Sequence, residues 1–381
     1  MSFGVARRMD GVERTLIRRI FDAAPPGSIN LGLGQPDLAT PPRICLAGID
    51  GIVAGKTGYT GTAGDPAVRA AVAARYPGVA SGAESVVVTI GSQEAVFASA
   101  MTLVDAGDEV LVPDPGYPAY PVVAQLLGAK ALTYPLRPER AFRIDPADVV
   151  ARLTPRTRLV ILCSPSNPTG AMDLDADLEV LAGALKDRGV WWLSDEIYAG
   201  FAYERRAPSI SRFTPACGLV VSGLSKDLSM TGWRIGWVVG PEAVVGRITA
   251  AHQYLVTCAS SVSQAAALVA LSAEAETDRA AYLEIFRRRR ALMADELRRI
   301  PRLPVTMPDG AFYFFLDVRA FGQSQEIAER LLRNRRVIVI PGEAFGPGGT
   351  GFLRVSYAAH DDDIRTGVRA LGEELAVSQK F

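Results

Sequence analysis

The sequence has no excess of charge and no long apolar run, and each absence excludes a class of protein. Lysine plus arginine and aspartate plus glutamate both number 41, so the net charge is zero and favours neither nucleic acid nor an anionic membrane as a partner. No apolar run approaches the roughly 18 residues that a membrane-spanning helix needs, and the first residues, MSFGVARRMDGVER, lack the apolar core of a signal peptide. We therefore expect a cytoplasmic protein with no membrane or nucleic-acid partner.

Histidine and cysteine are also scarce. The two histidines, His252 and His360, are too few for a histidine-based metal site and argue against a Ser-His-Asp triad, so we expect structural roles for both. The sequence has no CxxC pair, and its four cysteines lie far apart, at Cys45, Cys163, Cys217 and Cys258. We expect unpaired thiols in a reducing compartment and no bound metal.

What the chain does contain is a repeated alternation of strands and helices, in a length of 381 residues that suits a large domain plus a smaller one. The predicted strands are 86–90, 109–112, 159–162, 190–193 and 219–221, and the predicted helices are 93–103, 117–127 and 178–186. Near-continuous apolar strands separated by helices are typical of an α/β fold with a mostly parallel sheet that helices cover on both faces.

The C-terminal part has a different pattern. Strands at 311–316, 337–340 and 352–356, with helices between the first two and after Asp361, predict a smaller α+β domain. A helix-rich bridge precedes it, and the basic run Arg287–Arg290 in this bridge is predicted to be a solvated helix face. We divide the chain into an N-terminal segment that packs with the small domain, a large domain and a small C-terminal domain, at residues 1–40, 41–275 and 276–381.

Four polar residues come directly after apolar, strand-like runs: Ser92, Asn167, Asp195 and Lys226. Each has an alternative interpretation when it is taken alone. Asp195 could cap a helix, Asn167 could belong to a turn and Lys226 could be a surface lysine. Ligands of open α/β sheets bind beyond the carboxyl ends of the strands, so the shared placement favours one common site.

The residue types in this group indicate pyridoxal phosphate (PLP). Lys226 can hold the aldehyde as a Schiff base, Asp195 can pair with the pyridinium nitrogen, and Arg234, eight residues after the lysine, can bind the phosphate. The junction 91–93 joins a strand to a helix and offers free backbone N–H groups to an anion. Two other glycine-rich stretches, 32–37 and 346–349, lack the strand–turn–helix setting of a nicotinamide site, so we interpret them as turns.

At these residues the chain resembles the class I/II aminotransferases, the aspartate aminotransferase-like family of fold type I PLP enzymes. The resemblance runs from LGLGQPD through YTGTAGDPAVR, DPGYPAY, SPSNPTG, SDEIY and SKDLSMTGWRIGW to FLRVSYA, which is almost the whole chain. It implies a large domain with a mostly parallel sheet of the seven-stranded type and a smaller α+β domain. It also implies a ping-pong exchange of an amino group between an α-amino acid and a 2-oxo acid, in a homodimer with shared active sites.

The resemblance also assigns roles around the cofactor ring. Lys226 matches the Schiff-base lysine, whose freed amine moves the proton of the substrate α-carbon. Asp195 matches the partner of the ring nitrogen. Asn167 and Tyr198 match the pair that hydrogen-bonds the phenolic oxygen, and Tyr117 matches the aromatic residue stacked on the ring. We therefore expect Lys226, Asp195 and Tyr198 to be the catalytic residues.

Further roles concern the phosphate and the substrate. The matches to phosphate contacts are Ser92, Gln93, Arg234 and, reaching over from the neighbouring subunit, Tyr59. Arg354 matches the arginine that binds the substrate α-carboxylate, with Gly34 beside it, and Asn167 also belongs to the substrate site. The planar fork of an arginine suits a carboxylate in a way that lysine cannot reproduce.

Two positions depart from the family pattern. Gly223 stands where the family often has a phosphate-binding serine, and Ser222 is the candidate to replace it. Gln93 stands where close bacterial aspartate enzymes carry a lysine for the distal carboxylate, and the segment 258–264 contains no arginine to replace that lysine. We therefore do not expect a dicarboxylate to be the preferred amino donor.

Three other functions use the same residues or the same cofactor. They are β-elimination of the C–S lyase type, oxidation of an amino acid by oxygen, and non-catalytic regulation by a PLP-binding protein. The last is disfavoured because no helix-turn-helix domain precedes the motifs and every catalytic position is filled. The stretch 5–19 and the region of Phe312 and Tyr313 are expected to shape the substrate side-chain pocket, whose preference the sequence leaves open.

Overall fold

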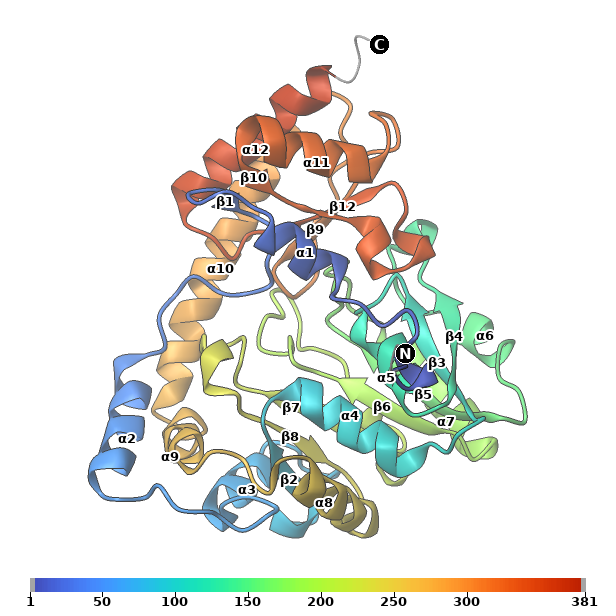
Figure 1. The fold of residues 1–381 in the computed structure, drawn as a ribbon, viewed down its shortest axis with the longest axis vertical. Helices are drawn as coiled ribbons and strands as arrows, with labels where there is room; N and C mark the ends of the chain where they lie inside the picture. The colour runs from blue at the N-terminus through green and yellow to red at the C-terminus, as the bar shows by residue number, and fades with distance from the viewer. Residues whose placement is uncertain (1–3, 378–381) are drawn as a thin grey trace.

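The computed structural model describes residues 4–377, and a seven-stranded sheet forms its larger part (Figure 1). Across the sheet the strands are β2 (Val86–Thr89), β8 (Gly236–Val239), β7 (Gly218–Gly223), β6 (Trp191–Asp195), β5 (Thr157–Cys163), β3 (Glu109–Asp114) and β4 (Lys130–Pro135). Six of the strands run in the same direction, and β8, which lies between β2 and β7, runs in the opposite one. The predicted α/β class with a mostly parallel sheet is therefore confirmed, although the sequence pattern missed β4 and β8.

Helices cover both faces of this sheet. One face packs against α4 (Ser92–Leu103), α5 (Ala119–Leu126) and α8 (Glu242–Val256), and the other against α3 (Pro66–Ala73), α6 (Pro146–Val150), α7 (Asp175–Asp187) and α9 (Ser261–Ala270). Strand β2 shows how the sequence serves both faces: Val87 packs with the first group, and Val86 and Val88 pack with the second. Successive side chains of a strand point to opposite faces, so a strand covered on both sides is apolar throughout.

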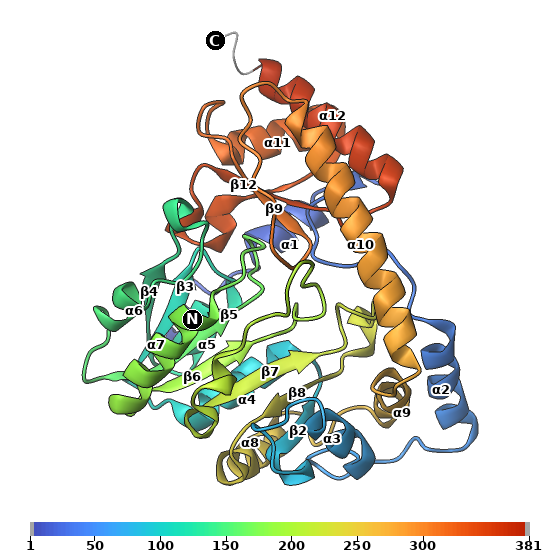
Figure 2. The ribbon, with the colours of Figure 1, turned by 180° about the vertical axis from the view of Figure 1, so that it is seen from behind.

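The long helix α10 (Ala275–Arg298) runs from the large sheet to the C-terminal elements (Figures 1 and 2). There a three-stranded antiparallel sheet has the order β11 (Ile340–Pro341), β12 (Phe352–Ser356), β9 (Tyr313–Asp317), and it lies beside α11 (Ser324–Arg335) and α12 (Asp361–Val377). The predicted strand 337–340 is divided in two. Its first half, β10 (Val337–Ile338), pairs with the N-terminal strand β1 (Ile29–Asn30) instead of joining this sheet.

The N-terminal segment has contacts in both parts of the molecule. Figure 1 shows α1 (Leu16–Asp22) and β1 beside the C-terminal elements, and Ile17, Ile20 and Phe21 pack against a small cluster around Ile338. The preceding residues instead accept hydrogen bonds from the Gln125 side chain of α5. Helix α2 (Pro42–Val53) packs against α9. The division at residues 40 and 275 stays a prediction.

Short 3-10 turns complete the described elements: η1 (Arg7–Met9), η2 (Ala83–Ser85), η3 (Pro138–Arg140), η4 (Ile210–Arg212), η5 (Pro215–Cys217), η6 (Thr231–Trp233), η7 (Gly342–Phe345) and η8 (Pro347–Gly349). Within residues 4–377, no helix is both long enough and apolar enough to cross a bilayer.

Two of the four arginines in the basic run on α10 depart from the prediction of a solvated face, whereas the side chains of Arg287 and Arg288 are exposed. Arg289 and Arg290 are buried. Arg289 forms two hydrogen bonds with the Asp37 carboxylate, at 2.6 and 2.9 Å, and Arg290 bonds to Glu204 at 2.8 Å. The helix passes between the two parts of the molecule, so this side of it faces protein and its arginines link segments that are distant in the sequence.

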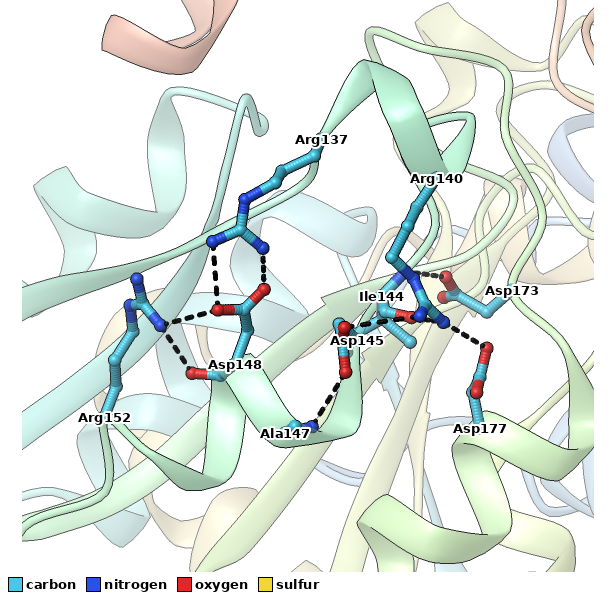
Figure 3. Close-up of polar contacts among 9 residues, drawn as sticks. All are labelled: Arg137, Arg140, Ile144, Asp145, Ala147, Asp148, Arg152, Asp173 and Asp177. Atoms are coloured by element: carbon cyan, nitrogen blue, oxygen red, sulfur yellow. Dashed lines mark hydrogen bonds and ion pairs between the residues drawn. The ribbon is translucent and has the colours of Figure 1, made fainter.

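The loop that carries Asn167 is anchored at its far end by Asp173. The buried Asp173 side chain accepts a hydrogen bond from the Ile144 backbone N–H at 2.9 Å (Figure 3). The Asp173 N–H also donates to Ser164 Oγ at 3.0 Å. Around this contact, Arg140 pairs with Asp177 at 3.2 Å on the surface. Exposed pairs of this kind contribute little, so the buried Asp173 contacts are the ones that fix the loop.

Candidate active site

A cavity of about 490 Å³ lies at the carboxyl end of the large sheet. Most of the residues expected at the site line it: Gly34, Ser92, Gln93, Tyr117, Asn167, Asp195, Tyr198, Lys226, Arg234 and Arg354. They come from the sheet, from the N-terminal segment and from β12. The cavity therefore gathers residues that are separated by more than three hundred positions in the sequence.

Lys226 follows the end of β7 and extends into the cavity. Its Nζ donates a hydrogen bond to the Gly34 carbonyl at 2.6 Å and lies 5.9 Å from the centre of the Tyr198 ring. Burial, followed by the positive charges of Arg354 and Arg234, lowers the pKa of the Lys226 amine to about 8. A substantial fraction of the amine is therefore neutral near physiological pH, as a nucleophile or a general base requires.

Asp195 is the last residue of β6 and is buried at the cavity wall. The Tyr120 hydroxyl donates to its Oδ2 at 2.8 Å, and the Ile197 backbone N–H donates to its Oδ1 at 3.2 Å. Burial raises the pKa of the carboxyl to about 6, although these hydrogen bonds and the charge of Lys226 oppose the shift. The group is thus mostly ionised at neutral pH and can hold a protonated ring nitrogen.

The first turn of α4 and Arg234 form an anion-binding corner. Helix α4 begins at Ser92 after Gly91, whose φ of 106° is in the region that favours glycine. A Cβ on Gly91 would lie 2.6 Å from Nη2 of Arg234, so glycine also allows the guanidinium to approach the turn. Helix N-terminal N–H groups beside an arginine bind phosphate well. The Tyr117 hydroxyl donates to Gln93 Oε1 at 2.9 Å at the edge of this corner.

Arg354 lies on β12, lines the cavity and is only 2% exposed. Its Nη1 donates to Asn167 Oδ1 at 2.7 Å, its Nη2 donates to the Gly32 carbonyl at 2.5 Å, and its guanidinium lies over the Tyr313 ring at 4.4 Å. Its Nε is buried without a hydrogen-bond partner among the described residues. Both of these acceptors are neutral oxygens, so the buried guanidinium is suited to gaining a carboxylate as its counter-charge.

Two tyrosines of the site lacked a distinct sequence signal. Tyr120, which bonds Asp195, lies inside the apolar helix α5 and looks like a core residue in the sequence. Tyr313 was expected only to shape the side-chain pocket, but its hydroxyl is 2.8 Å from that of Tyr198. A Cβ on Gly34 would lie 2.2 Å from the Tyr313 hydroxyl, so this position must be glycine.

The structure does not bring Ser222 to the cavity, so this residue cannot replace the serine that is absent at Gly223. Its hydroxyl donates to the Glu196 carbonyl at 3.2 Å, and it lines a second cavity of about 750 Å³ with Tyr76 and Trp237. The alternation along β7 places its side chain on the sheet face away from α4. Ser225, which the sequence analysis gave no role, lines the active-site cavity instead.

Tyr59 also lies outside the cavity of its own chain, and it is 88% exposed.

Within residues 4–377, no group of three or more histidine, cysteine, aspartate or glutamate side chains is arranged to hold a metal ion.

A half-buried lysine near a buried carboxylate, an anion-binding helix end and a buried arginine define the class, an aminotransferase of fold type I. The sequence model of the family described as "Aminotransferase class I and II" matches residues 26–371, and the chain belongs to this family. It is 35% identical to an aspartate aminotransferase of Pyrococcus horikoshii over 370 residues, 94% of each chain. It is 37% identical to an arginine–pyruvate transaminase of Pseudomonas aeruginosa, covering 90% of this chain and 88% of that protein.

The fold agrees with solved structures of this family. An aspartate aminotransferase of Thermus thermophilus, with maleate, superposes with a TM-score of 0.92 at 31% identity, over 98% of this chain and all (100%) of that one. The protein is therefore an aminotransferase, as the sequence analysis predicted. The relatives bear the names of different amino acids, so membership in the family leaves the substrate undetermined.

Proposed function

We propose that this aminotransferase uses PLP as its cofactor and exchanges the amino group between an α-amino acid and a 2-oxo acid in two half-reactions. The observation that supports this most is the meeting of Lys226, Asp195 and the first turn of α4 in one cavity. When bound, PLP supplies an aldehyde that accepts the amino group and a ring that withdraws electrons from the substrate α-carbon.

The residues divide the work by their position. With PLP bound, Lys226 would hold its aldehyde covalently, and the amine, once freed by the amino acid, would carry the proton away from the substrate α-carbon. Asp195, held by Tyr120, would keep the ring nitrogen protonated. Asn167 and Tyr198 would serve the phenolic oxygen, and Tyr117 the ring. The burial of Asp195 strengthens its electrostatic effect, because charges interact more strongly in a region of low dielectric constant.

Arg234, Ser92 and Gln93 are proposed to bind the phosphate, with Ser225 in place of Ser222. At the other end, Arg354 binds the substrate α-carboxylate and Gly34 leaves room for it. Each of these assignments pairs a cation or a set of free N–H groups with an anion, and the two anions lie at opposite ends of the cavity. That separation orients the amino acid so that its α-carbon faces Lys226.

The substrate side chain is proposed to lie near the N-terminal segment, because Thr15, Ile17 and Arg18 also line the cavity. Arg18 is already paired with Asp22, at 2.8 Å, on the same exposed helix. Together with the uncharged Gln93, this favours amino donors that have no second carboxylate. The donors are therefore expected to be monocarboxylic.

A homodimer with shared active sites is proposed from the exposed apolar surface. Large apolar side chains are exposed on α2 and α9, which pack together, and Tyr59 and Tyr254 are each 88% exposed. Apolar surface of this kind is usually covered by a partner. Tyr59 would reach the phosphate of the neighbouring subunit across this face. The unpaired state of the four cysteines is in keeping with a reducing cytoplasm.

The test combines a covalent label with a substrate panel. Borohydride reduction of the PLP-loaded protein should fix the cofactor on Lys226, as peptide mapping would show. A panel of amino donors against 2-oxoglutarate and pyruvate should then give the matching 2-oxo acid and a stable amino form of the cofactor. Ammonia and pyruvate from a cysteine conjugate, or peroxide from oxygen, as the main products would replace transamination with elimination or oxidation.

A further inference from the structure

A buried histidine–glutamate pair lies behind the anion-binding corner. His252 on α8 is 0% exposed, and its Nδ1 is 2.5 Å from Oε1 of Glu94 on α4. Its other ring nitrogen, Nε2, is buried without a hydrogen-bond partner among residues 4–377. The sequence analysis expected only a structural role for His252, and the proposed reaction does not use it.

Glu94 connects this pair to the phosphate turn. Its second oxygen, Oε2, accepts a hydrogen bond from the Ile90 backbone N–H at 2.8 Å. Ile90 directly precedes Gly91 and Ser92, where α4 begins. A side chain in the first turn of a helix that bonds a backbone N–H before the helix fixes the path of the chain into it. Glu94 therefore sets the direction of the free N–H groups that face the cavity.

The negative charge of Glu94 would weaken the binding of an anion at the first turn of α4, and His252 is placed to offset that charge. An ionised carboxylate in the first turn of a helix interacts well with the helix dipole, but it also cancels the positive potential that attracts an anion there. A phosphate bound at the same turn would be repelled by this like charge. A histidine that shared a proton with Glu94 across this 2.5 Å contact would leave the pair without net charge, and the turn would then keep both its anchor and its affinity for a dianion.

We propose that His252 and Glu94 are positioning residues for the cofactor phosphate: Glu94 fixes the turn, and His252 cancels the charge of Glu94. This inference rests on the proposed use of PLP. It predicts that the pair affects binding of the phosphate group specifically, and that removing the charge of Glu94 makes His252 dispensable.

The experiment measures the binding of PLP, of pyridoxal without phosphate and of inorganic phosphate to cofactor-free protein. His252→Asn keeps an amide donor but cannot carry the proton, so PLP binding should weaken about tenfold and pyridoxal binding should stay the same. Glu94→Gln removes the charge and still accepts the Ile90 bond. The double variant His252→Asn/Glu94→Gln should therefore return PLP affinity to within about threefold of the parent protein.

Two controls separate this role from a general loss of structure. Ile248→Val lies one turn earlier on α8 and is equally buried, and its apolar side chain cannot form a hydrogen bond or an ion pair with the two residues, so it should lower the melting temperature and leave PLP affinity unchanged. Glu94→Ala removes the anchor and should weaken inorganic phosphate and PLP together. This comparison remains informative even if His252→Asn does not fold.

The possible results are distinct. Unchanged PLP affinity in both His252→Asn and Glu94→Ala would overturn the inference, as would a double variant no better than His252→Asn. Equal losses for PLP and pyridoxal would also overturn it, because the effect would then not pass through the phosphate. A parent protein that fails to bind PLP at all would instead overturn the proposed function.

Discussion

The two sides of the active-site cavity differ in how the chain delivers their side chains. On the sheet side, Asp195 ends β6, Lys226 follows β7 and Ser92 opens α4 after β2. The carboxyl ends of these strands lie at the same end of the sheet, and this brings the three residues together. On the opposite side, Arg354 bonds to Gly32 and Asn167, which are 322 and 187 positions away in the sequence.

This difference indicates which part of the proposed reaction each side of the cavity serves. The sheet side is held by buried strands that pack on both faces, so it would offer fixed geometry to the proposed cofactor. The opposite side combines β12 with the N-terminal segment, whose α1 is a short helix with no buried residue. Changes there can alter the substrate without disturbing the sheet.

Lys226→Ala should abolish transamination, with a loss of about 10⁴-fold or more, because the variant has neither the covalent anchor nor the proton carrier. PLP should still bind non-covalently through Arg234 and Asp195, as a spectrophotometric titration can measure. A variant that binds PLP and retains turnover would show that another lysine performs the chemistry and that the sheet side is wrongly assigned.

Asp195→Asn should lower kcat by about 10²- to 10³-fold, the size typical of losing one preorganised electrostatic partner. Asn is nearly isosteric, so amino acid should still bind, and single-turnover kinetics should place the loss in proton removal from the α-carbon. Tyr120→Phe is the matched control, since it keeps the charge and removes one hydrogen bond. Wild-type turnover in Asp195→Asn would contradict the assignment.

Tyr59→Phe should weaken PLP binding about tenfold to a hundredfold, because a hydrogen bond to a charged group contributes about 1.5–3 kcal/mol. Mixing Lys226→Ala subunits with Tyr59→Phe subunits tests the shared site. In a hybrid dimer one site carries both changes and the other carries neither, so activity at low PLP should return. If hybrids form and restore nothing, Tyr59 does not act across the interface.

The reactivity of Lys226 should depend on pH in a way that separates it from the exposed lysines. The pKa of its amine is lowered to about 8, so the neutral form is lost as pH falls below this value. Acylation of Lys226 in cofactor-free protein should therefore slow about tenfold per pH unit below 8, and level off above it. Peptide mapping of the label, with exposed Lys130 as the internal reference, measures this. A midpoint near the ordinary lysine value would show that the cavity does not desolvate the amine.

Arg18→Ala should have the smallest effect, less than about fivefold on kcat/KM for uncharged donors, because an exposed pair with Asp22 contributes about 1 kcal/mol or less. The same donor panel should show no larger loss for aspartate or glutamate. A selective loss with these two donors would place a dicarboxylate side chain at Arg18 and would contradict the preference proposed from Gln93.

Local pattern predicted much of the fold and many of the residues that line the cavity. The strand at 86–90 and the helix at 93–103 follow from periodicity and apolar content, which depend on near neighbours in the sequence. Lys226, Asp195 and Asn167 could be assigned to one site because the carboxyl ends of parallel strands lie at the same end of a sheet. Strand β4 was missed because it has an exposed, mixed pattern at the sheet edge, and β8 because it begins with a glycine directly after the turn that carries Arg234.

The direction in which these side chains point, and the residues that they contact, follow only from the tertiary structure. It turned Ser222 away from the cavity, buried Arg289 and Arg290 against distant carboxylates, and placed Tyr120 on Asp195 and His252 on Glu94. These contacts join elements far apart in the chain. The facing of a side chain depends on which surfaces pack together, and a sequence specifies that packing only through the energy of the whole fold.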